Sequence, residues 1–320
     1  MSASGGDPRG AGAAAGGTGV GGPPAGAASA GGPPARPAPP SAWGRLRQAG
    51  LLPRVVVTLL GLPCFIVITL RGGLFFLLLV DVILLLGLRE FYAMMAGKGY
   101  RPYSAIGILC GLGVSWWVYR GGAAISLLLT LTLLLIMILE LLRHDTSHAQ
   151  AHIAITVLGV LYVGWLGSHL VLLRELPGLV GAPYDLGARL VFLVTAITWM
   201  GDIAAYFVGV SIGRRPLLAR VSPGKTVEGS AGGILAASAT GVVCALTFAP
   251  FLTPVAGAIL GLVGGLFGLL GDLVESLLKR DAGIKDSAVL IPGHGGVLDR
   301  FDSLLFTAPL LYYYLRSFVV

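Results

Sequence analysis

Residues 254–278 have the sequence PVAGAILGLVGGLFGLLGDLVESLL, and they carry no charge before Asp272. A helix needs about 20 mostly apolar residues to cross a bilayer, so this stretch predicts a transmembrane helix. Gly257, Gly261 and Gly265 recur every four residues, and small residues at this spacing let two helix backbones approach closely. We therefore expect this helix to lie centrally in a bundle of membrane helices, with the glycines serving packing.

The composition of the whole chain agrees with a membrane location. Of its 320 residues, 55% are hydrophobic and 12% are charged, and the mean hydropathy is +0.86. Soluble domains carry about 25% charged residues, so this composition favours a bilayer. The formal net charge of +7 comes from basic residues that form no continuous stripe, and we predict no nucleic-acid partner. Cys64, Cys110 and Cys244 lie far apart in apolar runs, which predicts neither a disulfide framework nor a zinc site.

Two regions follow from the distribution of apolar residues. Residues 1–42 consist mainly of Gly, Ala and Pro and contain no Leu, Ile or Phe. Such a segment cannot bury enough apolar surface to fold, so we predict a disordered tail followed by a polytopic membrane domain over residues 43–320. The tail has no apolar core of the kind that a secretory signal requires.

The membrane domain is predicted to be all-α. Apolar runs predict about nine transmembrane helices, and counts of eight or ten also fit the pattern. The runs lie near residues 54–70, 74–88, 104–119, 122–142, 153–173, 188–211, 230–250, 254–278 and 303–319.

The positions of the basic residues predict the orientation of this domain. With nine spans, 15 of the 22 Lys and Arg residues fall on the side of the N-terminus, five fall on the opposite side, and two lie in the tail. Because cytoplasmic loops are enriched in Lys and Arg, we expect a multi-pass protein of the cell membrane with a cytoplasmic N-terminus. The two most polar loops, near 212–229 and 279–302, then share the cytoplasmic face.

A group of polar residues interrupts the end of the eighth predicted span. Asp272, Glu275, Ser276 and Lys279 are spaced i, i+3, i+4 and i+7, so they share one face of a helix. Asp272 lies seven residues before Lys279, or about 10 Å deeper along the axis. A carboxylate at such depth is costly unless it faces a wet cavity, a cation or a metal ion.

Two more acids stand where the last predicted span begins. Asp299 and Asp302 are spaced i, i+3, and a loop that folds back would bring both beside Asp272. Three convergent carboxylates suit Mg²⁺, and the Gly295-Gly296 pair would let backbone N–H groups approach a phosphate. The alternative is that these acids only form ion pairs at the membrane surface. The available bases are Lys279, Arg280, Lys285 and Arg300.

Residues 276–302, SLLKRDAGIKDSAVLIPGHGGVLDRFD, resemble the signature of the phosphatidate cytidylyltransferase (CDP-diacylglycerol synthase) family. Two further stretches are similar to the same family: WMGDIAAYFVG at 199–209 and SPGKTVEGSAGG at 222–233. Gly224 departs from the polar or basic residue that the family commonly has there, which removes one cation but leaves Lys225. REFYAMM, at 89–95, is a weaker match to which we assign no role.

The resemblance implies a reaction in which a phosphate oxygen of phosphatidic acid attacks the α-phosphorus of CTP, giving CDP-diacylglycerol and pyrophosphate. The catalytic portion would span about residues 199–320, at the cytoplasmic end of the C-terminal helices, in a protein that contacts membrane lipid and forms a homodimer. The implied ligands of a two-cation Mg²⁺ site are Asp272, Asp299 and Asp302. The implied catalytic groups, which neutralise phosphate charge or stabilise the leaving group, are Lys225, Lys279, Arg280, His294 and Arg300. The implied substrate-binding residues are Ser222, Thr226, Lys285, Gly295, Gly296 and Asp202.

The resemblance leaves some polar residues without a role, and two other functions also fit part of the sequence. His144, His148 and His152 have the spacing of a possible zinc or nickel face, but we interpret them as part of a solvated interfacial loop. Asp81 has no partner that the sequence identifies. A secondary transporter would also carry intramembrane acids, and a CTP-dependent lipid kinase would share the nucleotide and Mg²⁺ chemistry.

Overall fold

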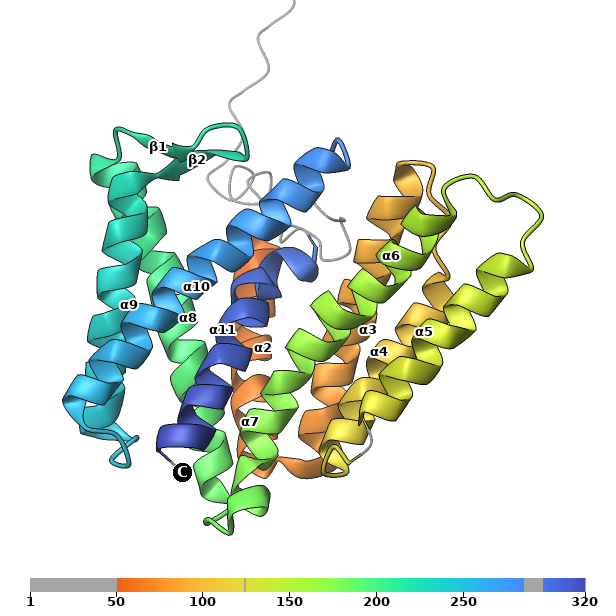
Figure 1. The fold of residues 1–320 in the computed structure, drawn as a ribbon. Helices are drawn as coiled ribbons and strands as arrows, with labels where there is room; N and C mark the ends of the chain where they lie inside the picture. The colour runs from red at the N-terminus through yellow and green to blue at the C-terminus, as the bar shows by residue number, and fades with distance from the viewer. Residues whose placement is uncertain (1–50, 124, 285–295, 320) are drawn as a thin grey trace, which may run out of the picture.

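The computed structural model of the chain describes residues 51–123, 125–284 and 296–319, and the predicted tail lies outside them. The described residues fold into helices and one short hairpin (Figure 1). The helices before the hairpin are α2 (Leu51–Arg71), α3 (Gly73–Gly97), α4 (Ser104–Tyr119), α5 (Ile125–Leu141), α6 (Ala149–Gly159), the π-helix η1 (Val160–Trp165), α7 (Leu166–Val180) and α8 (Asp185–Ile212). The remaining elements are β1 (Pro216–Leu218), β2 (Ser222–Thr226), α9 (Val227–Thr247), α10 (Pro254–Asp281) and α11 (Leu298–Phe318).

The all-α prediction is confirmed, and every predicted apolar run coincides with helix in the described part of the chain. Four helical rods there are long and apolar enough to cross a membrane: Ala149–Val180, Asp185–Ile212, Val227–Thr247 and Pro254–Asp281. The first rod joins α6, η1 and α7 without a break. The hairpin was not predicted, and it places β1 antiparallel to β2 within the polar loop that follows α8.

Large apolar side chains cover the outer surface of the helices. Leu60 on α2 is 69% exposed, Leu109 on α4 is 71% exposed, and Leu246 on α9 is 69% exposed. A soluble monomer rarely exposes apolar residues over such a wide area, whereas hydrocarbon chains solvate them well. The exterior of the bundle therefore suits lipid.

Helix α10 packs against α9 at glycines, as the four-residue spacing predicts. A Cβ atom on Gly241 of α9 would lie 1.9 Å from the carbonyl oxygen of Gly257. A Cβ atom on Gly261 of α10 would lie 2.2 Å from the carbonyl oxygen of Ala237. Both distances are far below van der Waals contact, so only glycine permits this approach. The close contact makes α9 and α10 a rigid wall for the residues between them.

The polar connections gather at one end of the bundle. Figure 1 shows the β1-β2 hairpin, the loop after α5 and the C-terminal end of α10 at the same end of the molecule. The side chain of Arg280 joins two of these parts, since its Nε donates to the carbonyl oxygen of Val221 at 3.2 Å. The hairpin and the end of α10 therefore form one continuous polar surface.

A buried arginine organises the opposite end. Arg174 of α7 is fully buried, and its guanidinium donates to the carbonyl oxygens of Thr69 (2.8 Å), Leu70 (3.2 Å) and Tyr184 (3.2 Å). The first two carbonyls belong to the last turn of α2, where the helix dipole favours a cation. The chain then turns at Gly72, which has φ +67° and passes so close to the guanidinium that a Cβ would clash. Arg174 thus fixes the turn from α2 into α3.

Candidate functional site

The β1-β2 hairpin is closed by residues at the start of α9. Thr226 is the N-cap of this helix, and its hydroxyl oxygen accepts from the backbone N–H of Gly229 at 3.1 Å. The carboxylate of Glu228 accepts the backbone N–H groups of Arg214 and Arg215 at 3.0 and 3.2 Å. The Glu228 bonds hold the segment that enters β1 against the start of α9, and Lys225 is the residue just before the cap.

Lys225 reaches from β2 to α10, where its ammonium forms an ion pair and hydrogen bond with the carboxylate of Asp272. The other oxygen of Asp272 accepts from the hydroxyl of Ser276 at 3.4 Å. The side chains of Lys225 and Asp272 are 23% and 31% exposed, so the pair is open to solvent or a ligand. The structure thus joins two of the predicted motifs through their charged residues.

A cavity of about 300 Å³ lies beside this ion pair, between α8, β2, α9 and α10. Its volume is at the lower end of the range for small-molecule sites. The polar side chains that line it are Thr198, Asp202, Tyr206, Lys225, Thr226, Ser230 and Asp272. Its remaining wall is largely glycine, including Gly229, Gly233, Gly264 and Gly268, which leaves backbone close to anything inside.

Asp302 and Asp202 join Asp272 near the cavity. Asp302 is buried where α11 packs against α10, since a Cβ atom on Gly271 would lie 2.6 Å from the carbonyl oxygen of Asp302. Ser303 contacts Asp302 and Asp202. Its N–H donates to Asp302 at 2.7 Å, and its hydroxyl donates to Asp202 at 3.4 Å. Ser303 thus places Asp302 beside Asp202 of α8, and the approach of the Asp302 carboxylate to Asp272 stays a prediction.

Asp299 lies in a neighbouring cluster around Lys279. The ammonium of Lys279 is 2.7 Å from Asp299 and 2.5 Å from fully buried Glu275. The second oxygen of Asp299 accepts the backbone N–H of Gly296 at 3.1 Å. The Gly296 amide predicted to bind a phosphate thus has a carboxylate partner in this structure.

The donor chemistry at these clusters suits a hard divalent cation. The oxygens of Asp202, Asp272 and Asp302 are of the type that Mg²⁺ prefers, and Lys225 supplies a single positive charge beside them. Across the described residues, no three His, Cys, Asp or Glu side chains are arranged as a ready metal-ligand set. The assignment of Asp272, Asp299 and Asp302 to Mg²⁺ therefore stays a prediction.

The other predicted residues divide into those that the structure places and those that it does not describe. Ser222 is half-buried in β2, Arg280 is tied to the hairpin, and Arg300 is exposed on the first turn of α11. Lys285, His294 and Gly295 lie outside the described residues. The roles predicted for all six remain predictions.

Two buried acids that the sequence left without a role belong to this region. Glu275 was recognised on the polar face of α10, and it now proves to contact Lys279 in the interior. Glu90, in the REFYAMM stretch, accepts hydrogen bonds from the start of α11. The sequence signal that could have identified Glu90 is its position on a face of α3 that is otherwise uncharged. Gly87 and Met94 lie on the same face and are also buried.

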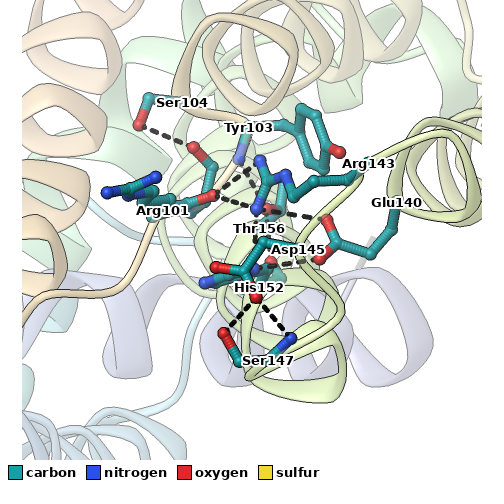
Figure 2. Close-up of polar contacts among 10 residues, drawn as sticks. Arg101, Tyr103, Ser104, Glu140, Arg143, Asp145, Ser147, His152 and Thr156 are labelled. Atoms are coloured by element: carbon teal, nitrogen blue, oxygen red, sulfur yellow. Dashed lines mark hydrogen bonds and ion pairs between the residues drawn. The ribbon is translucent and has the colours of Figure 1, made fainter.

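The histidine series differs from its prediction at one position. His144 and His148 are exposed, as expected for a solvated loop, but His152 lies in α6 and is buried. Its Nδ1 is 2.9 Å from Glu140 and 2.7 Å from Arg143. Figure 2 draws the residues of this cluster. The interpretation of His152 as solvated is therefore wrong, because the residue pairs with a buried acid on α5.

Two other acids outside the cavity also have partners. Asp145 accepts from the hydroxyl and N–H groups of Ser147, and these hydrogen bonds lower its pKa (Figure 2). Asp81, which the sequence left unassigned, accepts a hydrogen bond from the hydroxyl of Ser115 on α4.

The chain is similar in sequence to a known family and to several of its members. The model of a family described as the cytidylyltransferase family matches residues 52–318. A phosphatidate cytidylyltransferase of Synechocystis sp. is 35% identical over 280 residues, covering 82% of this chain and 95% of that protein. Proteins of the same name from Bacillus subtilis and Staphylococcus saprophyticus are 37% and 32% identical. Those matches cover 61% and 81% of this chain, and 66% and 96% of the relatives.

Proposed function

The chain belongs to the cytidylyltransferase family, and from this we propose that it transfers the cytidylyl group of CTP to phosphatidic acid. The products are CDP-diacylglycerol and pyrophosphate, so the protein is a nucleotidyltransferase of phospholipid synthesis. The observation that carries the proposal is the convergence of Asp202, Lys225 and Asp272 from three separate elements at one cavity, with Asp302 of α11 close to Asp202 through Ser303. A lysine among these acids, beside exposed backbone, suits a site for a metal-bound polyphosphate.

The reaction needs positioning and charge neutralisation more than covalent chemistry. A phosphate oxygen of the lipid forms a bond to the α-phosphorus of CTP, and the bond between that phosphorus and the bridging oxygen of the β-phosphate breaks. The electron pair leaves with pyrophosphate, so no nucleophilic side chain of the enzyme takes part. Lys225, which lines the cavity, neutralises phosphate charge as it develops in the transition state.

Further cations would act from the end of α10 and the start of α11. Lys279, Arg280 and Arg300 stand on these two segments, where they would bind the triphosphate and the incoming lipid phosphate. Ser222, Thr226 and Gly296 would add hydrogen bonds from the hairpin and the α11 entrance. Lys285, His294 and Gly295 complete the assignment on sequence grounds.

We assign Mg²⁺ to Asp272, Asp299 and Asp302, as a two-cation site. A bound divalent cation would supply charge neutralisation for the triphosphate. Asp202, which was assigned to substrate binding, stands close enough to Asp272 and Asp302 to contribute to the same field. Asp299 would have to exchange its contact with Lys279 for the metal, since these two groups are paired in the structure.

The proposed setting is the cell membrane, with about nine spans and a cytoplasmic N-terminus. The protein is a membrane protein, and the four long apolar rods and the apolar exterior support this placement. The catalytic portion, about residues 199–320, would then face the cytoplasm, where CTP is available. We propose contact with membrane lipid along the exterior and a homodimer as the assembled form.

The product formed from labelled CTP tests the reaction. Purified protein with phosphatidic acid should place label from [α-³²P]CTP in a lipid and label from [γ-³²P]CTP in pyrophosphate. The control pair is Asp272→Asn, in the cavity, and Asp281→Asn, on the same helix but 61% exposed and paired with Lys98. Asp281→Asn should retain activity, whereas Asp272→Asn should lose it. Transfer of the γ-label to lipid would indicate a lipid kinase, and an unlabelled lipid fraction would refute both reactions.

A further inference from the structure

Glu90 makes a contact between two distant parts of the chain. It lies near the C-terminal end of α3 and is 2% exposed. Its Oε1 accepts the backbone N–H of Val297 at 2.8 Å, and its Oε2 accepts the backbone N–H of Leu298 at 2.7 Å. Each carboxylate oxygen thus binds one amide at the start of α11.

Both the amides at the start of α11 and the buried carboxylate of Glu90 need a hydrogen-bond partner. The first amides of a helix have no partner within the helix, and the positive end of the helix dipole attracts an anion there. A buried carboxylate in turn requires hydrogen-bond donors to offset the loss of water. Helix α11 has no capping side chain of its own at Val297, and Glu90 of α3 takes that place.

The helix that Glu90 holds also carries acids of the candidate site. Asp299 is on the first turn of α11, and Asp302 follows one turn later. The preceding amide, that of Gly296, donates to Asp299 itself. Three successive amides at the α11 entrance therefore donate to carboxylates, and two of the three bind Glu90.

We propose that Glu90 is a positioning residue for cytidylyl transfer. By holding the amides of Val297 and Leu298, it fixes the place of Asp299 and Asp302 relative to Asp272 on α10. Glu90 does not line the cavity of the described structure, so it acts through α11 and not on the substrate. The inference rests on the proposed function, and it gives a role to the REFYAMM stretch, which the known reaction did not require.

The test compares Glu90→Gln with Glu140→Gln in the full-length protein. The glutamine at 90 keeps the size and one acceptor but turns an NH₂ group toward one of the two amides. Glu140 is a matched control, because it is also buried (5% exposed) and paired, with His152 and Arg143, at a place outside the cavity. Measured quantities are turnover, the Mg²⁺ concentration for half-maximal activity, the melting temperature, and deuterium exchange at 296–303.

A small displacement of a catalytic constellation costs about 10²-fold in rate, so we expect Glu90→Gln to lose between about 10-fold and 10²-fold in turnover. The Mg²⁺ requirement should rise, with part of the turnover restored at high Mg²⁺, and exchange should quicken at 296–303 alone. Glu140→Gln should keep turnover and Mg²⁺ dependence close to those of the unsubstituted protein, whatever its melting temperature. Glu90→Asp keeps the charge but reaches less far, so its turnover should lie between that of Glu90→Gln and that of the unsubstituted protein.

Three results would overturn the role of Glu90. They are unchanged turnover in Glu90→Gln, a loss equal to that of Glu140→Gln, or a loss that does not depend on Mg²⁺. If Glu90→Gln does not fold, the same measurements on Glu90→Asp decide the matter. Failure of the unsubstituted protein to make CDP-diacylglycerol would overturn the proposed function instead.

Discussion

Replacing Lys225 with methionine separates the two effects that this residue has on the protein. Methionine is close to lysine in length and apolar volume, so the substitution removes the ammonium and leaves most of the packing. In the structure, that ammonium pairs with Asp272 at the cavity wall. The expected losses in stability and in activity differ greatly in size.

The loss in stability should be small. The side chains of Lys225 and Asp272 are 23% and 31% exposed, and ion pairs open to solvent contribute only about 0–1 kcal/mol. The loss in activity should be larger, because removing one group that stabilises developing charge costs about 2.7–4 kcal/mol, or about 10²–10³ in turnover. The Michaelis constant for CTP should also rise, since the cation contacts phosphates before the reaction as well.

Lys98→Met is the matched control. Lys98 is 22% exposed and pairs with Asp281 at 2.5 Å, so its surroundings resemble those of Lys225, but it lies outside the cavity. Pyrophosphate release over a series of CTP concentrations, at a fixed mole fraction of phosphatidic acid, gives turnover and the Michaelis constant. Thermal unfolding of the same samples gives stability. Turnover of Lys225→Met within about threefold of the unsubstituted protein, or equal losses in the two variants, would refute the role of Lys225.

Three further predictions concern metal, packing and the tail. Asp299→Asn and Asp302→Asn should each lose orders of magnitude in turnover and recover in part at high Mg²⁺ or with Mn²⁺, because hard cations need carboxylate charge. Turnover near that of the unsubstituted protein at low Mg²⁺ would contradict this. Gly241→Ala should lower thermal stability by about 1–3 kcal/mol, since its Cβ would lie 1.9 Å from a backbone oxygen of α10. Gly61→Ala, with nothing within 4 Å, should not, and equal melting temperatures would exclude the close contact. Deletion of residues 1–40 should leave membrane insertion and turnover nearly unchanged, and loss of most activity in a well-expressed truncation would show otherwise.

The helices were predictable because each one is a continuous run of apolar residues in the sequence. The run at 104–119 coincides with α4, and the run at 254–278 falls within α10. The polar face of α10 was equally readable, because the spacing of Asp272 and Lys279 depends only on the helical repeat. Such features need no information about what lies opposite them.

The features that sequence alone missed depend on partners elsewhere in the chain. Nothing in REFYAMM indicates that Glu90 meets amides 207 and 208 residues later. His152 was predicted in a solvated loop, because the sequence does not show the acid on α5 with which it pairs. The hairpin was predicted only as part of a polar loop near 212–229, whereas bonds to the start of α9 hold it in place. Whether Asp299 binds a metal ion or forms an ion pair was left open for the same reason, since its partner Lys279 is on another helix.

The contact between Glu90 and Val297 also bears on the order of biosynthesis. A ribosome adds about 5–20 residues per second, so the 207 residues between them take roughly 10–40 s to appear. Throughout that interval, α3 carries an acid that lacks the two donors it will have in the finished protein. A buried carboxylate without its hydrogen-bond donors is costly. The burial of Glu90 therefore depends on the last helix of the chain, and α3 reaches its final surroundings only after α11 has been made.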